Sequence, residues 1–93
     1  MDKKKLKIAR NKIDQLDNDI FNLIIKRTKI VNFMLGLKKF RNQIVDRKRI
    51  NQILEKVKNK SLKKGVDPKI TIRIWKSIIW SYVAFQKRNF RKK

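Results

Sequence analysis

Apolar side chains recur at helical spacing along the first part of the chain, from about Leu6 to about Lys39. They form two rows that each repeat every seven residues: Leu6, Ile13, Ile20 and Met34 in one, and Ala9, Leu16, Leu23, Ile30 and Leu37 in the other. This periodicity predicts one long helix with a continuous apolar seam. Arg27 takes the remaining place in the first row, where an apolar residue is expected.

Two shorter helices are predicted after a break. The segment FRNQIV, residues 40–45, interrupts the periodicity and is expected to be a loop. Asp46 can cap a second helix and Gly65 can end it. Asp67 and Pro68 then supply an N-cap and a first helical residue, which predicts a third helix to about Phe90.

Each shorter helix has its own apolar positions. Those of the second are Ile50, Ile53, Leu54, Val57 and Leu62. The third carries Ile74, Trp75, Ile78, Tyr82, Phe85 and Gln86 along one side. The pattern therefore predicts an all-α fold of three helices, with residues 1–93 forming a single domain.

The expected length of the first helix bears on the oligomeric state. About 35 residues of helix span roughly 50 Å. A globule of 93 residues has a radius of gyration of only about 12–13 Å. Two short helices cannot cover so long a seam, so we expect an intertwined homodimer in which two long helices pair.

Composition removes several classes of chemistry. The chain has no cysteine and no histidine, so it lacks a thiolate nucleophile, the commonest general base and the commonest metal ligands. No metal and no cofactor is expected. Every uncharged run falls far short of the ~20 residues that span a bilayer, and the first residues lack the apolar stretch of a signal peptide. We expect a cytoplasmic protein with no membrane partner.

The charge is strongly positive, with 28 Lys and Arg against 7 Asp and Glu. Such a balance favours anionic partners, although lysine, isoleucine and asparagine are abundant together, as in proteins from AT-rich genomes. A basic helical protein that binds nucleic acid is one interpretation. It ranks below an enzyme, because no nucleic-acid motif is present and phosphate-binding residues should face outward, unlike Arg27.

Several polar side chains fall on apolar faces. Lys38 lies eleven residues after Arg27, so it projects from nearly the same face, and Gln86 lies in the apolar row of the third helix. Arg49 lies beside the apolar row of the second helix. Buried cations need anionic partners, and most of the acids are placed outward or at caps. A small dicarboxylate would supply the missing charge. Alternatively, Arg27 sets helix register or extends to the surface.

The order of these residues resembles the AroQ-type chorismate mutase family. The first helix reads IARNKIDQLDNDIFNLIIKRTKIV and then LKK, which is similar to the family's long first helix with its Arg, Ile-Asp-x-Leu-Asp-x-x-Ile, Arg and Lys. Asp46 and Arg49 resemble its Asp-x-x-Arg element, and the third helix ends in its glutamine, Gln86. The resemblance covers nearly the whole chain and implies three helices in an interlaced dimer.

The resemblance also implies roles for these residues. Arg27, Lys38 and Arg49 would line one pocket with Asp46, and Arg10 would reach in from the other subunit. The arginines would hold the two carboxylates of chorismate, while Lys38 and Gln86 would face its ether oxygen. The implied reaction, chorismate to prephenate, serves phenylalanine and tyrosine synthesis. It is a pericyclic rearrangement, which needs no nucleophile or metal.

Two pocket positions depart from a typical mutase. Ile50 stands where a glutamate is common, and Tyr82 stands where a serine is common. An aliphatic residue and Tyr-x-x-x-Gln at these places resemble isochorismate pyruvate-lyase, which releases pyruvate and salicylate. Both substrates carry two carboxylates, so the lyase is the alternative to the mutase.

Overall fold

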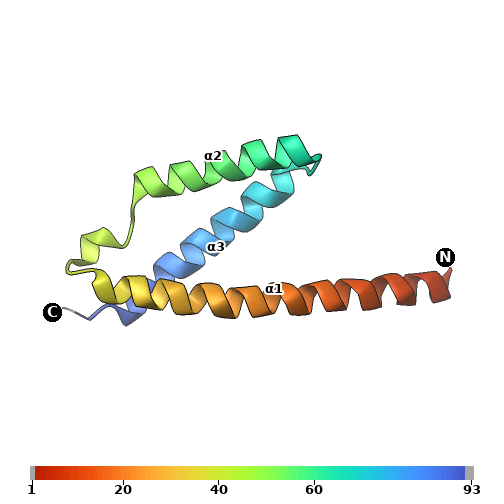
Figure 1. Ribbon diagram of the computed structural model, residues 1–93, viewed down its shortest axis with the longest axis horizontal. Helices are drawn as coiled ribbons and strands as arrows, with labels where there is room; N and C mark the ends of the chain where they lie inside the picture. The colour runs from red at the N-terminus through yellow and green to blue at the C-terminus, as the bar shows by residue number, and fades with distance from the viewer. Residues whose placement is uncertain (1, 92–93) are drawn as a thin grey trace. The chain divides into compact units, whose positions relative to one another are not determined.

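The computed structural model describes residues 2–91, which form three α-helices (Figure 1). They are α1 (Lys3–Leu37), α2 (Arg47–Lys64) and α3 (Pro68–Asn89), with a short 3-10 turn, η1 (Arg41–Gln43), between α1 and α2. Residues 2–91 contain no β-strand, which confirms the all-α class, and the 35 residues of α1 confirm the long first helix. No helix in this range combines the length and the apolar character that a membrane span requires.

The chain divides after Val31 into two compact units. The first consists of the N-terminal part of α1, whose apolar seam is open to solvent in the single chain. Large exposed fractions occur at Ile13 (55%), Leu16 (56%) and Leu23 (62%). An apolar stripe of this length on one helix has nothing within its own unit to cover it, so it is available to another helix.

The second unit holds the end of α1, η1, α2 and α3, and helix signals in the sequence define its turns. The Asp46 side chain accepts a hydrogen bond from the Arg49 backbone N–H at 3.0 Å, which caps α2. Asp67 caps α3 through the Lys69 N–H at 2.9 Å. Between these helices Gly65 adopts a left-handed conformation, with φ 72°. α2 and α3 thus form an antiparallel hairpin and pack together (Figure 1).

The two glycines predict opposite changes in stability. Gly65→Ala places a Cβ in a left-handed conformation and should lower the free energy of unfolding by about 1 kcal/mol. Gly36 lies in α1, and a Cβ there would meet no atom within 4 Å. Gly36→Ala should therefore raise the free energy of unfolding, by up to about 1 kcal/mol. Urea unfolding checks both, and shifts of the same sign would contradict the assignment of Gly65 as the special turn residue.

A small apolar cluster holds the second unit together at its α1 end. Leu35, Ile44 and Val83 are buried in contact with one another, and Val45 and Phe90 pack against them. These residues come from the last turn of α1, the loop, and α3. The cluster therefore fixes the end of α1 beside α3, which matters because Lys38 and Gln86 lie three residues beyond Leu35 and Val83.

The apolar faces of α2 and α3 differ in part from the expected ones. Leu62 is exposed, and Ser61 is buried in its place, with its hydroxyl 2.6 Å from that of Thr71. The reason is geometric, because Ser61 lies one turn after the half-buried Val57, whereas Leu62 is rotated away from it. In α3 the buried apolar residues are Ile79 and Val83.

Candidate active site

Lys38 directly follows α1 and lies against α3. Its backbone N–H donates to the Leu35 carbonyl at 3.1 Å, which closes the last turn of the helix. Because Leu35 is buried, this turn cannot rotate freely. The half-buried Lys38 side chain donates from Nζ to Oε1 of Gln86 at 2.6 Å. The structure thus brings together two of the residues proposed for catalysis, 48 positions apart in the sequence.

Gln86 is itself held in place. It is one of two buried polar residues within residues 2–91, with an exposed fraction of 7%. Its Nε2 donates to the Tyr82 carbonyl one turn earlier, at 3.2 Å. An ammonium has three N–H donors and a side-chain amide has two, so each group keeps donor capacity beyond these bonds. The pair can therefore present several hydrogen-bond donors and one positive charge to an anion.

The surroundings of Lys38 act on its charge. Partial burial lowers the pKa of the Lys38 ammonium below its usual value of 10.5, because removal from water disfavours the charged form. The carboxylate of Asp46 opposes this shift through its negative charge. Asp46, which sequence reasoning placed in the pocket, therefore interacts electrostatically with Lys38 in addition to capping α2.

The loop after Lys38 is fixed by Gln43, a residue that sequence analysis did not single out. Its Oε1 accepts hydrogen bonds from the backbone N–H groups of Lys39 at 2.7 Å and Phe40 at 2.9 Å. Glutamine three residues after a turn begins is the usual position for such a bond, and this was the available signal. Gln43 thus orients the backbone that carries Lys38.

The start of α2 contacts α3 through a cation–π interaction. The Arg47 guanidinium carbon lies 5.6 Å from the centre of the Trp80 ring, within the range for attraction to an aromatic face. Two residues on, Arg49 is exposed, whereas Ile50 is half-buried. The stack between Arg47 and Trp80 therefore helps to position the turn of α2 that holds both proposed pocket residues.

The remaining site residues expected from the sequence are Arg10, Arg27 and Tyr82. Arg10 is exposed and Arg27 is half-buried, and both belong to the first unit. They are seventeen residues apart on α1, which corresponds to about 25 Å along the helix axis. Tyr82 is half-buried in the second unit, with its ring edge-on to that of Phe85 at 6.3 Å between centres.

A comparison of the sequence with models of known protein families gives a match. The family model described as chorismate mutase type II matches residues 9–87 of the chain. The match runs from one residue before Arg10 to one residue after Gln86, so it includes every site residue expected from the sequence. Searches of curated proteins and of solved structures give no significant match.

Proposed function

Because the chain belongs to the chorismate mutase type II family, we propose that it is an isomerase that converts chorismate to prephenate. The observation that carries this proposal is the hydrogen bond between Lys38 and Gln86, at 2.6 Å. It joins a cation and an amide from two separate helical segments in a partly buried place. Such a pair suits an anionic substrate whose reaction needs hydrogen-bond donors.

The rearrangement requires few other groups from the protein. In the rearrangement the ether C–O bond breaks while a new C–C bond forms within the same molecule. Negative charge grows on the ether oxygen as the bond breaks. Donors that are already oriented towards this oxygen stabilise the transition state more than the ground state. We assign this role to Lys38 and Gln86, with Gln86 also holding the ammonium in position.

The two carboxylates of the substrate need cations of their own. We assign them to Arg27 and Arg49 in one chain and to Arg10 of a second chain. Arg10 and Arg27 are separated by about 25 Å along α1, too far for one small molecule to contact both within the same helix. If both bind substrate, they do so in different pockets, and the second chain must supply Arg10.

The exposed seam of α1 supports the same dimer. Ile20 and Ile30 expose 54% and 61% of their surface in the single chain. Burial of such side chains against a second chain stabilises the complex by roughly 25 cal/mol for each Å² of apolar surface. Pairing of two α1 helices would cover the seam and bring Arg10 of each chain towards the other. We therefore propose that the active species is a homodimer.

The protonation state of Lys38 predicts how the activity depends on pH. The catalytic form is the ammonium, so kcat/KM is retained below the pKa of Lys38 in the free protein and lost as the pH rises through it. Burial lowers this pKa, so the loss should begin at a lower pH than for an ordinary lysine. Lys38→Arg stays protonated throughout, and its normalised kcat/KM should be flat from pH 7 to 10.5. Identical profiles for the two proteins would contradict the role of Lys38.

Assays with two substrates test the proposed function. The pure protein is expected to form prephenate from chorismate at high turnover. Ile50 and Tyr82 favour the alternative, isochorismate pyruvate-lyase, because they resemble that enzyme at two pocket positions. Rapid formation of salicylate from isochorismate, with slow formation of prephenate, would reverse the ranking. Inertness towards both substrates would reject the enzyme, and inertness together with tight, steeply salt-dependent DNA binding would favour a nucleic-acid-binding protein.

A further inference from the structure

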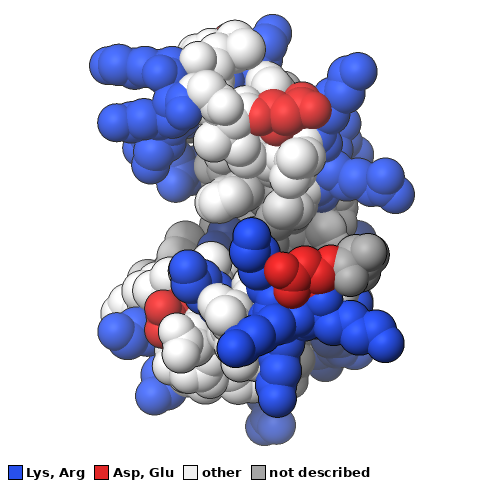
Figure 2. Space-filling view, turned by 90° about the vertical axis from the view of Figure 1, so that its right-hand side faces the viewer, with Lys and Arg blue, Asp and Glu red and all other residues white. Residues whose placement is uncertain are grey.

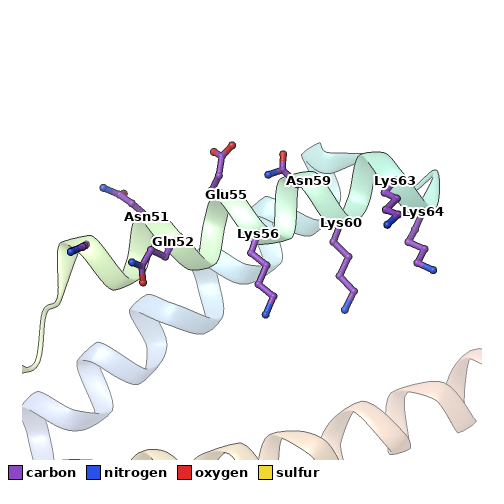
Figure 3. Close-up of a pocket in the computed structure, with 9 residues that line it drawn as sticks. Asn51, Gln52, Glu55, Lys56, Asn59, Lys60, Lys63 and Lys64 are labelled. Carbon is purple, nitrogen blue, oxygen red and sulfur yellow. The ribbon is translucent and has the colours of Figure 1, made fainter.

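α2 carries a lysine-rich face that the proposed chemistry does not use. An open pocket runs along this helix, and the nine residues that line it, drawn in Figure 3, all come from α2. We call them the α2 lysine face: Lys48, Asn51, Gln52, Glu55, Lys56, Asn59, Lys60, Lys63 and Lys64. Every one of these residues is exposed. None of them belongs to the expected substrate pocket.

The face is polar because α2 has two distinct sides. Its half-buried residues, which include Ile53, Leu54 and Val57, occupy the side that packs on α3. The α2 lysine face spreads over much of the remaining helix surface, and Lys60 and Lys64 border the packed side. Lys56, Lys60 and Lys64 extend towards one edge of it, and Asn51, Glu55 and Asn59 towards the other (Figure 3).

The charges on this face form a regular row. Lys56, Lys60 and Lys64 follow one another at four-residue spacing, which is about 6 Å along a helix. Glu55 is the one acid among the lining residues. The surface drawn in Figure 2 is similarly rich in Lys and Arg, with few acids among them. An extended row of cations attracts an extended row of anions more strongly than it attracts a single small ion.

Duplex nucleic acid provides such a row. It carries one negative charge for every ~1.7 Å of its axis. The face extends from Lys48 to Lys64, roughly 24 Å of helix, so several lysines along it can reach successive phosphates. Lysines and side-chain amides are common phosphate and sugar contacts in such complexes. The outward placement of these lysines is also what phosphate binding requires.

Other macromolecules fit this face less well. The centres of protein interfaces are depleted in lysine and enriched in aromatic residues, and the α2 lysine face contains no aromatic or aliphatic residue. Helices that lie on membranes insert their apolar side into the lipid, whereas that side of α2 packs on α3. We propose that the α2 lysine face is a docking surface for a nucleic-acid duplex, which it holds through the phosphates.

The test uses a labelled DNA duplex of 20 base pairs and fluorescence anisotropy over a series of salt concentrations. The face variant combines Lys56→Gln, Lys60→Gln and Lys64→Gln. The control combines Lys3→Gln, Lys4→Gln and Lys5→Gln, which are exposed residues of α1 and remove the same charge. Glutamine retains helix propensity, and circular dichroism should show equal helix content in all three proteins.

The face variant should bind the duplex at least tenfold more weakly than the unchanged chain at 100 mM salt. Its plot of log affinity against log salt should lose about 0.9 in slope for each phosphate contact removed, or roughly 2–3 in total. The control should change affinity less than threefold. Equal losses in both variants would overturn the proposal, as would no binding by the unchanged chain at 50 mM salt. Equally tight, face-dependent binding to phosphatidylserine vesicles or to polyglutamate would also overturn it.

Discussion

Lys38→Ala is expected to lower kcat for chorismate by about a hundredfold or more, with a smaller effect on KM. Removal of one oriented donor to a developing oxyanion costs ~3–4 kcal/mol in the barrier. The donor acts mainly in the transition state, so the loss should appear in kcat. Steady-state measurement of prephenate formation gives both constants directly.

The neighbouring Lys39 offers a matched control. Lys39→Ala removes the same charge one residue away, where the side chain is exposed. Its backbone N–H bond to Gln43 does not depend on the side chain. The control should retain turnover within about a factor of two, since an exposed charge interacts weakly with its surroundings. Near-normal turnover in Lys38→Ala, or an equal loss in both variants, would remove Lys38 from the reaction.

Mixing two inactive variants is expected to restore activity. One chain carries Arg10→Ala and the other carries Lys38→Ala. If Arg10 acts across subunits, every mixed dimer contains one intact pocket, with Lys38 from the first chain and Arg10 from the second. Random pairing in a twofold dimer makes half of the dimers mixed, so about a quarter of all pockets should be intact. The two proteins are unfolded together, refolded, and assayed against each alone.

A second mixture controls this experiment. Lys38 and Gln86 are hydrogen-bonded within one chain, so they belong to the same pocket. Mixing Lys38→Ala with Gln86→Ala leaves one defect in every pocket and should restore nothing. If the mixture with Arg10→Ala also stays at the mean of its components, Arg10 does not act across subunits. A monomeric mass at micromolar concentration would contradict the dimer itself.

Local signals predicted the helices well. Asp46, Gly65 and the Asp67–Pro68 pair each act within a few residues of themselves, so the boundaries of α2 and α3 followed from the sequence. Which side of each helix is buried depends on contacts with other segments. For that reason Leu62 was expected in the core, whereas the structure buries Ser61 there.

In the candidate site, too, local patterns could be predicted from the sequence, whereas contacts between distant segments could not. Arg27 and Lys38 were noticeable because they interrupt an apolar pattern on one helix. The contact of Lys38 with Gln86 joins residues 48 positions apart, and only the family resemblance linked them beforehand. Gln43 holds its loop through backbone N–H groups, and its one signal in the sequence is its position three residues after Phe40.

The small size of the buried cluster has a consequence for how the chain reaches its native state. Among residues 2–91, no side chain has less than 2% of its surface exposed, and the cluster rests mainly on Leu35, Ile44 and Val83. In the proposed homodimer, a chain with so little interior would gain much of its apolar burial from the second copy. Acquisition of structure and assembly then become a single equilibrium, and the melting temperature should rise with protein concentration.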